Sequence, residues 1–184
     1  MILGHSFVRR LQSDLSRNFD QRASIDFKFD ECSVRLFGTG RRTIKKVRQH
    51  DMRLIEKFDP DIIILELGTN DLSFLPPEVV GSELDEFIRF LLQRFSMKIV
   101  AVCKVINRSD DTFNSKAAIL NQYLEVVLGD LPNVLVWTHM GLVQPKHNVL
   151  LPDGVHLNPQ GQYKLYRSYR GVILQALRKF QSLT

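Results

Sequence analysis

The strongest constraint on the fold is a short apolar run, Ile62–Leu67, interrupted only by Glu66. The run is too short for a typical helix, and it lacks the alternation of a strand that has one face in water. It therefore predicts a strand that is covered on both faces. Such strands occur mainly in parallel sheets with helices packed on each side.

Other β-like and helical segments alternate along the chain, as a parallel sheet with crossover helices requires. The remaining expected strands are Met1–Gly4, Cys32–Phe37, Ile99–Ile106 and Val134–Thr138, and the expected helices are His5–Phe19, Thr43–Phe58, Pro77–Phe95, Phe113–Leu128 and Pro159–Phe180. We predict an α/β fold: a three-layer α/β/α sandwich with a five-stranded parallel sheet, flavodoxin-like in outline.

The composition agrees with one domain over residues 1–184, because 184 residues with 44% hydrophobic content can bury a substantial core. No apolar run is long enough to span a bilayer, and no signal-peptide pattern opens the chain. We expect an intracellular, cytoplasmic protein. Because the sequence starts inside an expected strand, we also expect a domain excised from a longer protein. Cys32 and Cys103 are expected to be buried free thiols.

Three residues carry the parts of a nucleophilic hydrolase. Ser6 supplies a hydroxyl, and Asp153 and His156 supply a carboxylate and an imidazole just before the last expected helix. In such sites the imidazole takes the hydroxyl proton and the carboxylate orients the imidazole.

The expected topology brings further polar groups to the same place. Ser6, Gly40 and Asn70 each follow the end of an expected strand. In parallel α/β sheets the ligand crevice lies beyond the carboxyl ends of the strands, so these residues should converge there.

Four short segments, residues 4–6, 38–40, 68–71 and 153–156, together resemble the sequence blocks of the SGNH hydrolase superfamily, also called GDSL-type esterases and lipases. The resemblance covers nearly the whole chain. It implies a serine esterase with Ser6 as nucleophile, His156 as general base and Asp153 as the orienting acid. It also implies an oxyanion hole made by the backbone N–H groups of Ser6 and Gly40 and the side-chain amide of Asn70.

Two details qualify this resemblance. The interval between Thr43 and Asn70 is similar to that in platelet-activating-factor acetylhydrolase-like members, which favours Gly40 over Gly38 as the oxyanion glycine. The usual first block is Gly-Asp-Ser, whereas here His5 replaces the aspartate. The family aspartate is outside the triad, so the replacement leaves the chemistry intact but puts in doubt how the loop is braced.

Each block also has a structural interpretation. Ser6 could cap the first helix, Gly38 and Gly40 could be turn glycines, and Asn70–Asp71 could be a capping turn. Likewise, Asp153–Gly154 is a turn signal by itself, which would leave His156 as a structural histidine.

The other histidines suggest further interpretations, including a metal site. His5 is an alternative base, although adjacent side chains rarely point the same way. His50, His139 and His147 are interpreted as surface or loop residues. A metal site formed by His139, His147 and Asp153 is disfavoured, because a serine nucleophile makes it redundant. No metal or cofactor is expected.

The loops near the expected site suggest a substrate class. Apolar side chains that include Leu72, Phe74 and Leu151 should border an apolar mouth, and the absence of a large insertion favours short, acetyl-type acyl groups. Arg41 and Arg42, beside the oxyanion glycine, would favour a substrate with a negative group. A small ester, lipid-linked or free, is the expected substrate, and a homodimer contact is left open.

More narrowly, the run from Ile2 to Leu11 and the GxG-x-x-T segment at residues 38–43 resemble esterase domains in the first open-reading-frame protein of some LINE-type retrotransposons. The net charge of +5 leaves open a different function, a catalytically weak module that binds RNA or anionic membrane through basic helices. A flavodoxin-like phosphate binder is a weaker rival, because it gives Asp153 and His156 no purpose. The basic residues concerned are Arg9, Arg10, Arg17, Arg22, Arg41, Arg42, Lys45, Lys46 and Arg48.

Overall fold

The computed structural model describes the whole chain except residues 18–23, 25–26, 31, 96, 144–148 and 183–184. Its parallel sheet has five strands in the order β2-β1-β3-β4-β5. The strands are β1 (Ile2–Gly4), β2 (Leu36–Gly38), β3 (Ile62–Glu66), β4 (Ile99–Cys103) and β5 (Val134–Trp137). The helices are α1 (Ser6–Arg17), α2 (Ile44–His50), α3 (Met52–Phe58), the 3₁₀ turn η1 (Asp71–Ser73), α4 (Pro77–Arg94), α5 (Asp111–Leu128) and α6 (Pro159–Gln181).

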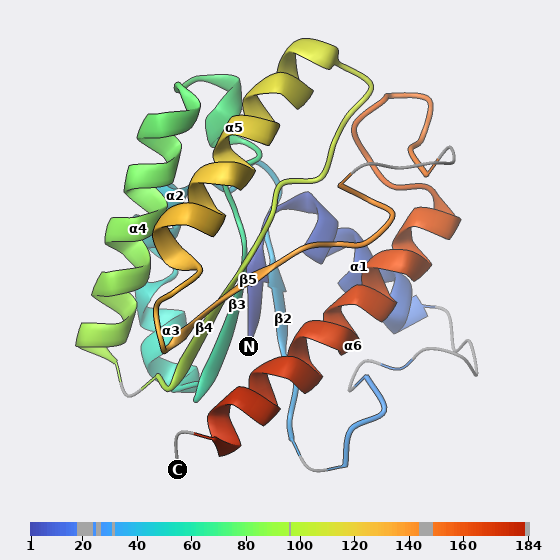
Figure 1. Ribbon diagram of the computed structural model, residues 1–184. Helices are drawn as coiled ribbons and strands as arrows, with labels where there is room; N and C mark the ends of the chain where they lie inside the picture. Colours follow the sequence, from blue (N-terminus) through green and yellow to red (C-terminus); the bar gives the residue numbers. More distant parts are fainter. Residues whose placement is uncertain (18–23, 25–26, 31, 96, 144–148, 183–184) are drawn as a thin grey trace.

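The helices form two layers around the sheet (Figure 1). Helices α1 and α6 cover one face, and α2, α3, α4 and α5 cover the other. The central strand β3 shows how the sequence produces this arrangement. Ile64 belongs to the apolar core beneath α1 and α6, whereas its neighbours Ile63 and Leu65 belong to the core on the opposite side. The run Ile62–Leu67 is therefore buried on both faces, and the predicted three-layer fold is confirmed.

Several element boundaries differ from those expected. The predicted helix Thr43–Phe58 is two helices that meet at Asp51, whose carboxylate forms an ion pair with Arg42 at 2.8 Å. Strand β2 is shorter than expected, so Cys32 lies outside it and is only half buried. Cys103 is buried at the end of β4, and no disulfide joins it to Cys32. The expected end of the first helix, at Phe19, lies outside the described residues.

The strand ends on which the expected site depends are packed closely. In the sheet register Gly4 pairs with Gly38 on one side and with Glu66 on the other. A Cβ at Gly4 would lie 2.6 Å from the Cβ of Glu66, and one at Gly38 would lie 2.0 Å from the backbone nitrogen of Arg9. Both glycines thus let β1, β2 and α1 approach one another at the carboxyl edge of the sheet.

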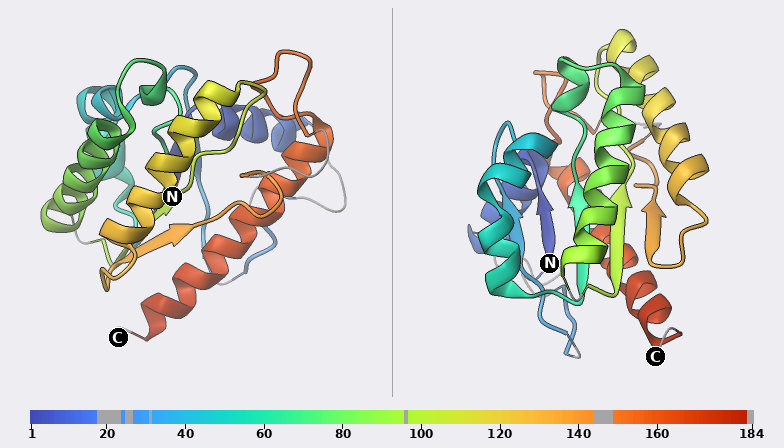
Figure 2. Two further views of the ribbon diagram at one scale, coloured as in Figure 1. Left: turned by 45° about the horizontal axis from the view of Figure 1, so that its top comes forward. Right: turned by 90° about the vertical axis from the view of Figure 1, so that its left-hand side faces the viewer.

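The strands all point toward this edge, while the last helix runs back to the opposite one (Figure 2). The loops that follow the strands consequently gather at one end of the molecule. Within the described ranges, none of the helices has both the length and the apolar composition of a bilayer-spanning segment.

Candidate active site

A cavity of about 560 Å³ opens at the carboxyl edge of the sheet. Ser6 enters it because the residue follows β1 immediately and begins α1. His156 reaches it from the loop before α6, so the two ends of the chain meet here, as predicted. The described residues that line the cavity are His5, Ser6, Phe7, Arg9, Arg10, Thr39, Gly40, Arg41, Thr69, Asn70, Ser73, Arg108, Val155 and His156.

Asp153 and His156 form an acid–base pair. The Nδ1 atom of His156 lies 2.7 Å from Oδ2 of Asp153, while the backbone N–H groups of Val155 and His156 both donate to Oδ1 at 2.9 Å. These backbone bonds and the imidazole bond hold the pKa of Asp153 well below its usual range. The carboxylate therefore stays ionised and holds Nδ1 of His156, which leaves Nε2 for a second partner.

Gly40 and Asn70 lie in the same cavity wall as Ser6. The Asn70 amide donates one hydrogen bond to the backbone carbonyl of Arg42, at 2.8 Å. An amide nitrogen has two N–H groups, so one hydrogen remains for a ligand. The bond to Arg42 also fixes the side-chain amide against the loop that carries Gly40.

The neighbouring Asp71 ties this loop to η1. Its Oδ1 atom accepts the backbone N–H of Ile44, at the start of α2, at 3.0 Å. Burial raises the pKa of Asp71 to about 6, although the hydrogen bond from Ile44 opposes that shift. Asp71 therefore anchors the start of α2, which lies 27 residues earlier in the chain. Asn70 makes no cap bond with its side chain.

His5 does not occupy the position of a general base. The ring is buried, its Nδ1 accepts the backbone N–H of Phe7 at 3.4 Å, and its Nε2 lies 3.8 Å from Oε1 of Glu66. Burial lowers the pKa of His5 to about 4, against the opposing charge of Glu66. His5 is therefore neutral and lies between the loop that carries Ser6 and the buried Glu66.

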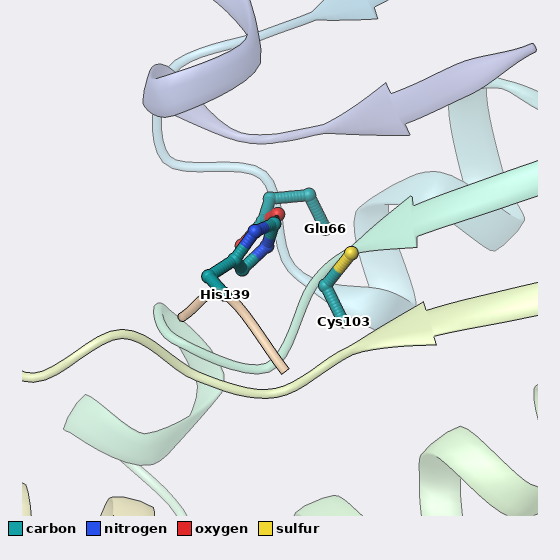
Figure 3. Close-up of side chains that lie close together, drawn as sticks. All are labelled: Glu66, Cys103 and His139. Atoms are coloured by element: carbon teal, nitrogen blue, oxygen red, sulfur yellow. The ribbon is translucent and has the colours of Figure 1, made fainter. Parts of the chain in front are cut away.

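Glu66 lies at the centre of a buried polar cluster (Figure 3). Its Oε2 atom accepts the Tyr169 hydroxyl at 2.8 Å and lies 2.9 Å from Nε2 of His139. Burial alone would raise the pKa of Glu66, but the charge and hydrogen bond of His139 and the bond from Tyr169 outweigh it and lower that pKa. The carboxylate is thus a buried, compensated anion.

His139 lies in the loop after β5, as expected, but its side chain is fully buried, so the surface interpretation is wrong. Its Nδ1 atom bonds the Ser168 hydroxyl at 2.8 Å. Glu66, Cys103 and His139 offer ligand atoms within 4.8 Å of one another, close enough for a metal ion. However, Glu66 and His139 already hydrogen bond to each other and to neighbouring hydroxyls, so the group is complete as a hydrogen-bond network. His50 is exposed as expected, and His147 lies outside the described residues.

The structure does not bring every expected substrate-binding residue to the cavity. Arg41 lines it, but Leu72 is buried in the core against α4 and α5, and Phe74 is 82% exposed. Leu151 lines a separate hollow between α1 and α6. The wall is therefore polar and basic, and the expected apolar mouth is not found here.

Arg108 also lines the cavity with Asn70, although it was not among the expected site residues. Its Nη2 atom donates to the carbonyl and hydroxyl of Thr69 at 3.2 and 3.1 Å, and its guanidinium lies 3.9 Å from the centroid of the Phe113 ring. Its position could have been inferred, because Arg108 lies just beyond the carboxyl end of β4, and residues that follow the strands of a parallel sheet gather at this edge.

A serine, an imidazole paired with a carboxylate, and an asparagine amide lie around one cavity on a parallel α/β sheet, and hydrolases that act through a serine use these groups. The sequence model of the GDSL-like lipase/acylhydrolase family matches residues 3–164. The chain belongs to this family, and it is a carboxylic ester hydrolase with an SGNH hydrolase fold.

Solved structures with the same fold include other esterases. A GDSL-like lipase from Bacteroides thetaiotaomicron has a TM-score of 0.68 at 12% identity, covering 95% of this chain and 87% of its own. An acetyl esterase mutant with a bound acetate ion has a TM-score of 0.67 at 16% identity, covering 100% and 98%. A mutant of a Geobacillus acetyl-xylooligosaccharide esterase has a TM-score of 0.67 at 12% identity, covering 97% and 92%. No curated protein matches the chain. The narrower resemblance to retrotransposon esterase domains stays a prediction.

Proposed function

We propose that the protein hydrolyses short-chain, acetyl-type carboxylic esters through Ser6, His156 and Asp153. The observation that carries this proposal is the shared cavity, into which Ser6 and His156 come from opposite ends of the chain. Asp153 holds Nδ1 of His156 at 2.7 Å, so Nε2 is the atom available to take the serine proton.

The reaction proceeds in two steps. His156 removes the proton of Ser6 while the hydroxyl oxygen attacks the ester carbonyl, and the imidazolium then protonates the departing alcohol. Water, activated by the same imidazole, hydrolyses the acyl-serine and releases the acid. Asp153 stabilises the imidazolium in both steps without itself taking the proton.

Three hydrogen-bond donors stabilise the negative charge that develops on the carbonyl oxygen. They are the backbone N–H groups of Ser6 and Gly40 and the remaining amide hydrogen of Asn70. Each donor in a comparable site contributes roughly 2.7–4 kcal/mol to the transition state. Asn70 is fixed by its bond to the Arg42 carbonyl, so little reorganisation is needed when the charge appears.

The acetyl preference is supported by the residues of the cavity wall, because among its described side chains only Phe7 and Val155 are apolar and could contact a long acyl chain. Acetyl esters are also named for two proteins of the same fold. Turnover of p-nitrophenyl acetate, butyrate and octanoate should fall in that order when compared as kcat/KM. A rise with chain length would contradict the short-acyl assignment.

The nucleophile is tested with Ser6→Ala. This variant should lose about 10³-fold or more of kcat/KM on p-nitrophenyl acetate and should no longer be labelled by a fluorophosphonate. Ser73→Ala is the matched control, because Ser73 is a second serine of the cavity wall. Equal activity of the Ser6→Ala variant and the wild type would refute the mechanism.

A second candidate function is binding of RNA or anionic membrane through exposed basic side chains such as Lys45, Lys46 and Arg48 of α2. Phosphate contacts of this kind weaken steeply as salt rises. Salt-dependent RNA binding together with no Ser6-dependent ester turnover would favour this candidate over the esterase.

A further inference from the structure

The active-site cavity has a strongly one-sided charge. Four arginines line it, Arg9, Arg10, Arg41 and Arg108, and no carboxylate is among its described lining residues. Asp153 lies behind His156 and is bonded to it, and Glu66 is buried beneath His5. The described side chains that line the cavity therefore carry a net positive charge.

These arginines are available to a ligand. In the described part of the chain none of the four forms an ion pair, whereas Arg42, just outside the cavity, is neutralised by Asp51 at 2.8 Å. The Nε atoms of Arg10 and Arg108 are buried and have no hydrogen-bond partner among the described residues. A guanidinium whose hydrogen-bonding capacity is not filled can bind a carboxylate or phosphate through charge-assisted hydrogen bonds.

Arg108 is the best-placed anchor of the four. Two bonds from Nη2 to Thr69 and the face of Phe113 hold its guanidinium in one position, next to the oxyanion donor Asn70. The pKa of Arg108 is lowered by burial, against the charge of nearby Asp110, but a guanidinium remains charged at neutral pH. A preorganised cation loses little side-chain entropy when it binds a carboxylate or phosphate.

We propose that the enzyme selects esters that carry an anionic group, a carboxylate or a phosphate, close to the scissile bond, and that Arg108 holds this group with help from Arg41. This inference rests on the proposed esterase function and names its substrate class. The exposed Arg41 lies directly after Gly40 and lines the same cavity as Arg108.

The test uses three acetyl esters of one short alkyl chain that ends in a hydroxyl, a carboxylate or a phosphate. The intact protein should prefer at least one anionic ester over the neutral one by about tenfold or more in kcat/KM, and added salt should reduce this preference. Comparing the carboxylate and phosphate esters decides which anion the site takes. Equal kcat/KM values for all three esters would overturn the proposal.

Variants then assign the preference to residues. Arg108→Gln should reduce the ratio of anionic to neutral kcat/KM to near one, and Arg108→Lys should restore part of it. Arg41→Gln should reduce the ratio more weakly. Arg178→Gln is the matched control, because it removes the same charge from the last turn of α6, at the far edge of the sheet. An equal loss on neutral and anionic esters in Arg108→Gln would mean that Arg108 serves the oxyanion, which overturns the proposal.

The outcomes separate this inference from the esterase assignment. Loss of neutral-ester turnover in Ser6→Ala together with no anion preference in the wild type would leave the esterase standing and sink the inference. Neutral-ester turnover that survives Ser6→Ala would instead sink the proposed function.

Discussion

Replacing His5 with the aspartate that is usual in its family should destabilise this protein. The reason is Glu66, whose Oε1 atom lies 3.8 Å from Nε2 of His5 in a buried site. An aspartate would put a second carboxylate against the first, with no solvent between them. His5→Asn is the matched control, because it has the shape of aspartate without the charge and can still accept the Phe7 N–H.

The size of the effect follows from two independent limits. Aspartate is shorter than histidine, so its carboxylate would lie roughly 5 Å from that of Glu66, where two unit charges repel by about 3 kcal/mol at an effective dielectric constant of about 20. The pair can escape by binding a proton, and holding an ordinary carboxyl protonated at pH 7 costs about 4 kcal/mol. We therefore expect His5→Asp to be about 3–4 kcal/mol less stable than His5→Asn at pH 7.

The proton shared by the introduced aspartate and the Glu66 carboxyl in the His5→Asp variant also determines how the stability of this variant depends on pH. The folded His5→Asp variant would bind a proton that its unfolded chain does not, so its stability should rise as pH falls, by about 1.4 kcal/mol per pH unit. Urea denaturation at pH 7 and pH 5 measures this, and the gap to His5→Asn should shrink to roughly 1 kcal/mol at pH 5. Equal stability of the two variants at both pH values would refute the role assigned to Glu66.

Three further results are expected. Because the pKa of Asp71 is raised to about 6, ionising this carboxyl destabilises the folded state. The free energy of unfolding of the wild type should therefore fall by up to about 3 kcal/mol relative to that of Asp71→Asn between pH 4 and pH 7. Denaturant titrations across this range measure the difference, and the same pH dependence in both proteins would contradict the burial argument. Gly38→Ala should destabilise the fold by several kcal/mol, as overpacking of a core does, because the added Cβ would collide with backbone atoms of Arg9. An unchanged thermal unfolding midpoint would contradict this packing. Asp153→Asn should lower kcat on p-nitrophenyl acetate by about 10²-fold or more with a much smaller change in KM, because the imidazole loses its orienting charge; a change confined to KM would count against the triad.

The convergence of Ser6, Gly40 and Asn70 could be predicted because it depends on topology alone. Any residue just past a strand of a parallel sheet must reach the same edge, so short β-like runs in the sequence were sufficient. The pairing of Asp153 with His156 was similarly accessible, because the two residues are close in the sequence and their geometry is local.

The partners of buried charges could not be predicted in this way. Glu66 is a charge within an apolar run, but its neighbours His139 and Tyr169 come from the loop after β5 and from α6 and have no local pattern. Leu72 and Leu151 show the same limit. Each follows an element near the site, yet which side of a loop faces the cavity depends on packing against helices far away in the sequence.

The loop that carries Asp153 and His156 is held together by hydrogen bonds among its own residues. Within four residues Asp153 accepts three hydrogen bonds, while the attachment of this loop to the rest of the fold includes the bond from the Ser109 N–H to the Gly154 carbonyl. A shift of the loop would therefore carry the imidazole and its counter-charge away from the serine together. Partial unfolding at this edge should switch turnover off in a single step, with the imidazole still correctly oriented by its own carboxylate.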